Sequence, residues 1–258
     1  MLLDRGASSQ QDLPWDVYTD RASLYAKHRF DYPSELVDRV VAYTGLRPED
    51  TVADIGSGTG KLTQHFVDRV RQVFCVEPNT AMMAEAEVRL GSHSSFVGIP
   101  GRAEATGLAD GSVSLIVSGM ALDWFDPSVT LPEFRRVSRP PGWLAVFRYQ
   151  IDRAFLQRLS RGLGEYSMPP KIRKPGTSDP SAYLSPGYIT LTQKCSCEES
   201  WERFVGGTLS TASAPAADSP EFGEYCQAHR RAFLELSEDG EVHLDYTCTA
   251  TIGQLRRA

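Results

Sequence analysis

The 258-residue sequence has no long apolar run and no excess of positive charge. Its apolar stretches fall well short of the roughly 18 residues expected of a transmembrane helix, and Met1–Gly6 lacks the apolar region of a secretory signal. The formal net charge is −6, which disfavours a polyphosphate partner. We therefore expect a cytoplasmic protein that binds neither a membrane nor nucleic acid.

Cysteine and histidine are too scattered to indicate a metal site. Cys195 and Cys197 form a C-x-C pair, not the C-x-x-C of redox and zinc sites, and no second Cys/His pair supplies zinc-finger spacing. We expect no metal. The odd number of cysteines, five, fits a reducing compartment. With 41% hydrophobic and 23% charged residues, the chain is typical of a globular protein.

A glycine-rich turn, Gly56–Gly60, lacks the spacing of two common phosphate-binding loops. The dinucleotide fingerprint G-x-G-x-x-G would need glycine where Lys61 stands. A P-loop would need glycine where Ile55 stands and Ser or Thr where Leu62 stands. Neither loop type is therefore expected.

What is present is a short apolar run, the turn, and a helix-compatible segment. The run Val52–Ile55 contains one acid, Asp54, and a helix is expected over Lys61–Val70. Glycine allows a ligand close to the backbone, and the free N–H groups of a helix start favour negative ligand groups. The pattern D-x-G-x-G-x-G resembles motif I of the class I S-adenosylmethionine-dependent methyltransferases, with an ordinary loop as the alternative.

A second predicted strand, Gln72–Glu77, ends in an acid 21 positions after Gly56. An acid at the tip of this strand is placed to accept hydrogen bonds from both hydroxyls of a ribose. The alternative is a solvated acid or a helix cap, because Pro78-Asn79-Thr80 is typical of a helix start.

A third predicted strand, Ser95–Ile99, precedes a loop of small residues, Gly101–Leu108, and a fourth strand follows within Asp110–Ser118. In the resembled family the loop after strand three holds the adenine, and Ala103 and Glu104 match that place. Met82 is a candidate for the adenine face, although a methionine at helical spacing is more often core.

The resemblance extends to small-molecule enzymes of the trans-aconitate methyltransferase type. It includes Tyr25–Pro33, Gly119–Asp126, the turn Ser138–Gly142 before a strand Trp143–Tyr149, and parts of the C-terminal region, Thr208–Pro215 and Val242–Leu255. Asp123 stands where many relatives have histidine, and Phe30 where many have proline. Both departures concern the substrate and the chemistry rather than the cofactor.

Alternating strand and helix patterns predict an open parallel sheet. The resemblance implies a doubly wound α/β fold with a mostly parallel seven-stranded sheet, helices on both faces and an antiparallel last strand beside strand five. We expect a single Rossmann-like methyltransferase domain over 1–258. Its parts are an N-terminal helical cover (1–45), a cofactor-binding core (46–150), an insertion over the acceptor site (151–188), and C-terminal strands and helices that complete the sheet (189–258).

The implied cofactor is S-adenosyl-L-methionine, the product is S-adenosyl-L-homocysteine, and the partner is a small-molecule substrate. Candidate substrate residues are Met120, Asp123 and Trp124. Candidate cofactor residues are Tyr25, Arg29, Asp54, Gly56, Ser57, Gly58, Gly60, Glu77, Pro78, Met82, Ala103, Glu104 and Ser118.

A general base is needed only for some acceptors. Asp123 and His28 are the candidate catalytic residues; the alternatives are a helix-start carboxylate and a packing histidine. The expected reaction is O-, N- or C-methylation by in-line displacement. The alternative is a cyclase or isomerase of the same fold that binds the cofactor without transferring methyl.

Overall fold

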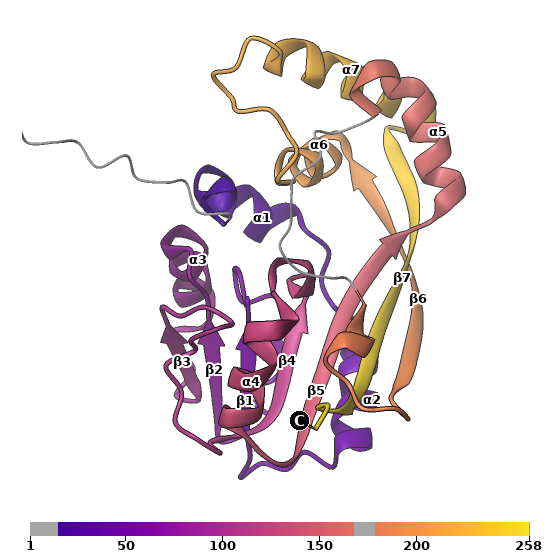
Figure 1. Ribbon diagram of the computed structural model, residues 1–258. Coiled ribbons are helices and arrows are strands. Elements are labelled where there is room, and N and C mark those ends of the chain that lie inside the picture. The colour runs from indigo at the N-terminus through magenta and orange to yellow at the C-terminus, as the bar shows by residue number, and fades with distance from the viewer. Residues whose placement is uncertain (1–14, 168–178, 258) are drawn as a thin grey trace, which may run out of the picture.

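A seven-stranded sheet forms the centre of the fold in the computed structural model, which describes residues 15–167 and 179–257 (Figure 1). The spatial order is β3-β2-β1-β4-β5-β7-β6. Strands β1 to β5 pair in parallel, and β7 is antiparallel to both neighbours, which confirms the predicted α/β sheet. The strands are β1 (Thr51–Ile55), β2 (Gln72–Val76), β3 (Phe96–Ile99), β4 (Val113–Gly119), β5 (Ser138–Ile151), β6 (Ile189–Ser200) and β7 (Glu241–Gln254).

Helices cover both faces of this sheet, as predicted. The α-helices are α1 (Ala22–His28), α2 (Ser34–Thr44), α3 (Thr80–Leu90), α4 (Pro127–Val137), α5 (Arg153–Leu163), α6 (Trp201–Leu209) and α7 (Phe222–Leu236). Short 3-10 helices are η1 (Asp16–Arg21), η2 (Thr63–His65), η3 (Leu122–Trp124), η4 (Gly164–Ser167) and η5 (Pro180–Ala182). Within the described residues no helix is both long and apolar enough to cross a membrane.

Two apolar layers hold the helices to the sheet. On one face Leu36 and Val40 of α2 and Leu90 of α3 pack with strand residues such as Val52. On the other face Phe134 of α4 packs with strand residues of the alternate register. This division follows from the two-residue period of a strand, which sends successive side chains to opposite faces.

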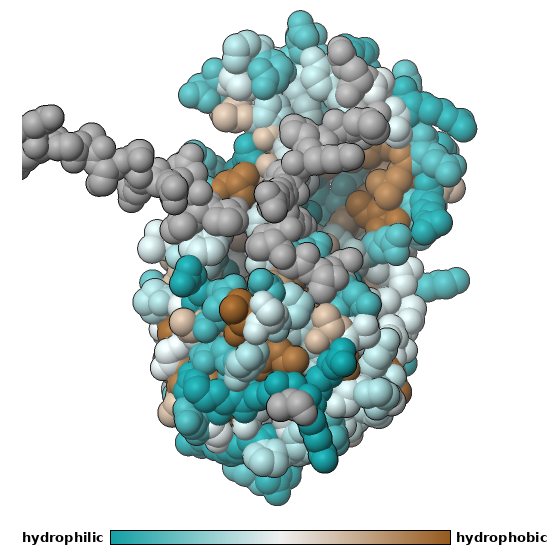
Figure 2. All heavy atoms as spheres, viewed as in Figure 1, coloured by the Kyte–Doolittle hydropathy of each residue, from teal (hydrophilic) through white to brown (hydrophobic). Residues whose placement is uncertain are grey.

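A second group of helices stands above the sheet. Strands β5, β6 and β7 extend beyond the other strands, and α5, α6 and α7 gather around their upper ends (Figure 1). An aromatic cluster that includes Phe155, Phe204 and Phe233 forms the core there. In the space-filling view apolar side chains line the hollow between these helices and the sheet (Figure 2). Residues 168–178 of the insertion predicted at 151–188 to cover the acceptor site lie outside the described residues.

The helix predicted over Lys61–Val70 is wrong. Only η2 is helical, and the segment turns through bonds of the 3-10 type, such as Phe66 N–H to Thr63 O at 2.9 Å. Thr63 turns inward, where its hydroxyl donates to Asp54 Oδ2 at 2.7 Å. The apolar spacing of this segment reflects the packing of Leu62 and Phe66 in the core. The tighter 3-10 turns keep the Thr63 side chain against Asp54 of β1.

The turn predicted at Ser138–Gly142 is instead part of β5. Ser138 pairs with Val113 and Trp143 with Leu115, so the residues between them bulge out of the register. The strand therefore begins five residues earlier than the predicted Trp143, because the bulge interrupts the ladder without ending it.

Gly60 tests how tightly the glycine turn packs on α3. Its φ is +76°, and an added Cβ would lie 2.9 Å from Leu90 Cδ1 and 3.3 Å from Ala86 Cβ. Gly111 is a matched control, with φ +57° and no atom within 4 Å of an added Cβ. Each Gly→Ala change costs about 1–2 kcal/mol for the left-handed backbone, so we expect Gly60→Ala to destabilise by about 1 kcal/mol more than Gly111→Ala. Equal losses in denaturant unfolding would contradict this packing.

Candidate active site

Two adjoining cavities open at the carboxyl ends of β1 and β4. The larger has a volume of about 880 Å³, including space open to solvent at its mouth, and the smaller about 350 Å³. They share Tyr25, Gly56, Gly58 and Gly119. Ligands of open α/β sheets bind in this position, where the strand order reverses.

The structure brings most of the predicted site residues to these cavities. Asp54 and Ser57 line the smaller cavity, together with Tyr25, Gly56 and Gly58. The predicted residues on the larger cavity are Tyr25, Gly56, Gly58, Glu77, Pro78, Met82, Ala103, Glu104, Met120 and Trp124.

Glu77 is fixed by the two backbone segments that flank the larger cavity. Its Oε2 accepts from Gly58 N–H and its Oε1 from Asn79 N–H, both at 2.9 Å. The side chain is buried, and burial raises the pKa of its carboxyl. The cap of α3 is Asn79, whose Oδ1 accepts from Ala81 and Met82 N–H. Asn79 rather than Glu77 therefore caps α3, and Glu77 joins the glycine turn to the start of that helix.

Asp54 lies in the smaller cavity with one oxygen unused. Its Oδ2 accepts from the Thr63 hydroxyl, whereas Oδ1 is buried without a hydrogen-bond partner. Burial raises the pKa of Asp54 to about 7. A buried oxygen of this kind is costly unless a ligand donates to it.

Two cations lie at the smaller cavity: Lys61 is part of its lining, and Arg29 contacts two tyrosines of that lining, Tyr25 and Tyr149. Arg29 lies over the ring of Tyr25 at 5.0 Å and donates to the Tyr149 hydroxyl at 3.1 Å, while its Nε is buried without a partner. Lys61 lines the same cavity, and burial lowers the pKa of its amine. Tyr25 and Arg29 were both predicted as cofactor residues, and the structure places them in contact, whereas Lys61 was not predicted from the sequence.

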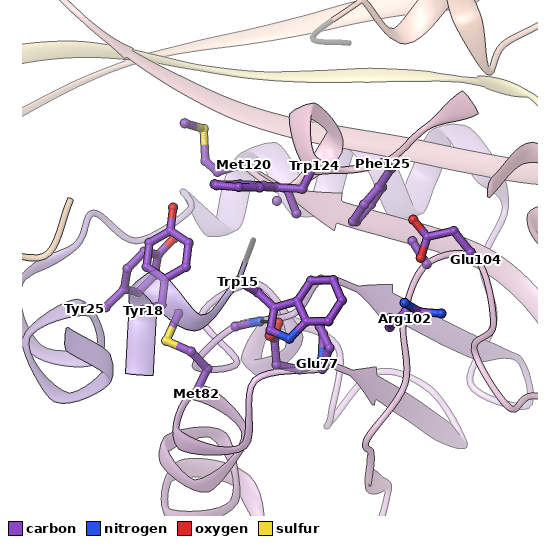
Figure 3. Close-up of a pocket in the computed structure, with 16 residues that line it drawn as sticks. Trp15, Tyr18, Tyr25, Glu77, Met82, Arg102, Glu104, Met120, Trp124 and Phe125 are labelled. Carbon is purple, nitrogen blue, oxygen red and sulfur yellow. Dashed lines mark hydrogen bonds between the residues drawn. The ribbon is translucent and has the colours of Figure 1, made fainter. Parts of the chain in front are cut away.

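Aromatic side chains from the N-terminal arm, residues 15–28, close one side of the larger cavity. Tyr18 meets Tyr25 edge-on at 5.8 Å and Trp124 at 6.0 Å. The two tyrosines lie together on one side of the cavity and Arg102 and Glu104 on the opposite side (Figure 3). Trp15 and Tyr18 were not predicted as site residues, because no local sequence pattern connects the N-terminal helical cover to the cavity.

Met120, which lines the larger cavity together with Trp124, has an unusual backbone conformation. Its φ is 56°, in the left-handed region that residues other than glycine rarely adopt. Its N–H donates to Phe147 O, and Tyr149 N–H donates to its sulfur at 3.5 Å. Such conformations persist where surrounding contacts enforce them, and they concentrate at ligand sites.

Several predicted site residues have other placements. The Ser118 hydroxyl donates to Ile55 O, and Gly60 faces α3. The His28 ring lies buried against Gly206 of α6, and neither cavity lining includes it. The two linings also omit Asp123, whose carboxylate pairs with Arg148 Nη2 at 2.9 Å. Sequence spacing did not reveal these partners, since each lies on a distant element.

Comparison with known proteins assigns the central part of the chain. The methyltransferase domain family matches residues 53–146. The uncharacterized methyltransferase Rv3342 of Mycobacterium tuberculosis is 35% identical over 122 residues, 47% of each chain. Residues 53–146 therefore form a methyltransferase domain. The chain spans about half the length of the curated relatives it matches.

Solved structures support the fold of this methyltransferase domain. A protein described as a type II methyltransferase from Anaeromyxobacter dehalogenans has a TM-score of 0.62 at 23% identity, covering 88% of this chain and 97% of its own. A methyltransferase from Geobacter sulfurreducens in complex with S-adenosyl-L-homocysteine has a TM-score of 0.50 at 17% identity, covering 92% of this chain and 97% of its own. Weaker curated relatives include ribosomal RNA methyltransferases, so the expected absence of a nucleic-acid partner stays a prediction. The finer likeness to trans-aconitate methyltransferases also stays a prediction.

The residues of the methyltransferase domain fit S-adenosylmethionine as its cofactor. The unpartnered Asp54 Oδ1 offers an acceptor to a donor group of the ligand. At Gly58, with φ +57°, an added Cβ would lie 3.3 Å from Met82 Cε, in space that a ligand close to the backbone needs. Glu77 presents a fixed carboxylate on the same wall.

Asp54 predicts a pH-dependent effect on stability. The folded chain keeps the Asp54 proton up to a pKa of about 7, whereas the unfolded chain releases it near 3.8. This residue therefore lowers the free energy of unfolding as pH rises between these values. Asn at this position does not titrate, so the Tm of Asp54→Asn relative to wild type should rise from about pH 5 to about pH 8. Asp218→Asn, at an exposed position, is the control and should show no such trend. A flat difference for Asp54→Asn would contradict the burial argument.

Proposed function

We propose that the protein transfers a methyl group from S-adenosylmethionine to a small-molecule acceptor. The observation that carries the proposal is the pair of cavities that meet at Gly56 and Gly58, one lined by the fixed Glu77 carboxylate and one lined by Asp54 and Lys61. The cofactor supplies an activated methyl group when it is bound. The residues of the chain then have mainly to bind, orient and exclude water.

The larger cavity is proposed to hold the nucleoside. Glu77 would accept hydrogen bonds from the ribose, and Met82, Ala103 and Glu104 would surround the adenine. These residues come from three elements that end at the same edge of the sheet. Their convergence supports this arrangement, because the sequence places them 27 positions apart, from 77 to 104.

The smaller cavity is proposed to hold the amino-acid end. Lys61 in the lining supplies positive charge suited to a carboxylate, and Arg29 adds positive charge next to Tyr25 and Tyr149 of that lining. Asp54 supplies an acceptor suited to an ammonium group. The two signs of charge within one enclosed space match a zwitterion. Ser57, Gly60 and Ser118 are proposed as structural supports of this wall rather than ligands, since each contacts protein atoms.

The acceptor is proposed to bind against Tyr18, Met120 and Trp124. This end of the cavity is apolar and aromatic. Among the described residues of the larger lining, the carboxylates are Glu77 and Glu104, which stand by the nucleoside. That composition supports an acceptor whose nucleophile is reactive without a strong protein base. Oxygen, nitrogen and carbon nucleophiles all stay open.

Cofactor binding tests the proposal directly. Calorimetry of the wild-type protein should show micromolar binding of S-adenosylmethionine and S-adenosylhomocysteine, about −8 kcal/mol. Glu77→Ala removes a charged acceptor and should weaken binding about 10- to 100-fold, that is about 1.5–3 kcal/mol. Glu35→Ala, which removes an exposed carboxylate, is the matched control. No binding heat in folded wild-type protein would end the proposal.

Asp123 is proposed to position η3 rather than to act as a base. Its pairing with Arg148 ties η3 to β5 beside Trp124. Asp123→Asn keeps a hydrogen-bond acceptor toward Arg148, so turnover with an accepted substrate should fall less than about 10-fold, whereas loss of a general base costs about 10²- to 10⁴-fold. Measuring methyl consumption together with product also separates transfer from cyclase chemistry. A loss of about 100-fold or more would restore Asp123 to the catalytic residues.

A cytoplasmic location and the exclusion of nucleic acid belong to the same proposal. The net charge of −6 supports it. The sequence at the end of β4 and just after it is Ser118-Gly-Met-Ala rather than the Pro-Pro-aromatic sequence of base-amino methyltransferases. Labelled methyl transfer to total RNA should be absent under conditions in which a small acceptor is methylated. Saturable transfer to RNA would contradict it.

A further inference from the structure

Asn79 connects the methyltransferase domain to the N-terminal arm. Its side-chain Nδ2 donates to Trp15 O at 3.0 Å and to Thr19 Oγ1 at 2.9 Å. Both acceptors belong to the start of the arm, 60 or more positions away in the sequence. The residue is only 3% exposed, so water competes little for these bonds.

The same residue also holds the nucleoside wall. Its Oδ1 accepts from Ala81 and Met82 N–H at the start of α3, both at 3.0 Å. Its backbone N–H donates to Glu77 Oε1 at 2.9 Å. One buried amide therefore joins the arm, the helix that carries Met82, and the carboxylate proposed to bind the ribose.

The remaining bonds of the arm hold later positions. Arg21 donates to Thr211 O and Ala214 O, and Arg89 donates to Ala26 O. At the start of the arm, the two hydrogen bonds from Asn79 fix the positions of Trp15 and Thr19 relative to α3. The centre of the Trp15 ring then lies 5.8 Å from the Arg102 guanidinium, and both residues line the larger cavity (Figure 3).

Helix capping alone does not require asparagine at this position. Ser, Asp and Asn all cap a helix through a side-chain oxygen. Among these, asparagine alone adds two amide donors. The two donors are both used, and both point to the arm.

We propose that Asn79 is a positioning residue for the cofactor: it holds Trp15 and Tyr18 as the outer wall of the nucleoside cavity, so that arm position and cofactor affinity are linked. The inference rests on the proposed function for the identity of the ligand. Because binding linkage is reciprocal, a cofactor that favours the closed arm must itself be bound more tightly when the arm is held.

Asn79→Ser separates the two tasks of the residue. Serine keeps an oxygen for the cap of α3 and loses both donors to the arm. Hydrogen–deuterium exchange of peptides from residues 16–28 should be several-fold faster in the cofactor-free variant than in wild type. Thr19→Val removes one of the two acceptors and leaves α3 unchanged, so it should also speed the exchange of these peptides, but to a smaller extent. Asn79→Ala, which also loses the cap, is the comparison for damage to α3.

Affinity for S-adenosylhomocysteine completes the test. We expect its Kd to rise about 3- to 10-fold in Asn79→Ser, which corresponds to about one charge-neutral hydrogen bond, and the protection that it gives the arm to shrink. Unchanged arm exchange in the variant would overturn the inference, as would faster exchange with unchanged affinity. A change in Asn79→Ala alone would reduce Asn79 to a helix cap. If wild type fails to bind the ligand, the proposed function fails, while exchange in the free protein still reports on the arm.

Discussion

The Glu77 carboxylate between two backbone N–H groups is the contact on which the site depends. It joins the glycine turn, through Gly58, to the start of α3, through Asn79. The glycine turn and the start of α3, which both flank the larger cavity, are thereby fixed in the absence of a ligand. Charge-assisted bonds to backbone N–H groups are strong and short, and preorganised groups of this kind bind without a further cost of ordering. From Asn79 the same connection continues to the arm.

Two buried carboxylates, Asp54 and Glu77, set the electrostatic character of this edge of the sheet. Burial raises the pKa of each, and neither has an ion-pair partner among the described residues. Buried acids without a cation destabilise a folded chain, so they are expected where a ligand compensates. A hydrogen bond from the Thr63 hydroxyl partly offsets the cost of burying Asp54. Because this bond requires Thr63 to face β1, the segment after the glycine turn forms tight 3-10 turns instead of an α-helix.

Local sequence patterns predicted the parts of the fold that local physics determines. The apolar runs predicted β1 to β4 to within about three residues. The helix over 61–70 and the extent of β5 were missed, because a buried Thr63–Asp54 bond and a strand bulge override spacing. At the site, spacing found Glu77, but the Asp123–Arg148 pair and the aromatic arm depend on contacts between distant elements.

The wall proposed to bind the acceptor is built mainly by packing. Trp124 is held from one side by Tyr18 of the arm, while Met120, on a left-handed backbone, is fixed by β5 through Phe147 and Tyr149. The Asp123–Arg148 pair secures the short helix between them. The Asp123 carboxylate thus has its partner in an arginine on the neighbouring strand β5. An apolar wall distinguishes ligands by their shape, and a difference of one methylene group changes the binding free energy by about 1–3 kcal/mol. Because the arm and η3 define the shape of this wall, we expect selectivity for the acceptor to depend on how rigidly these two segments are held.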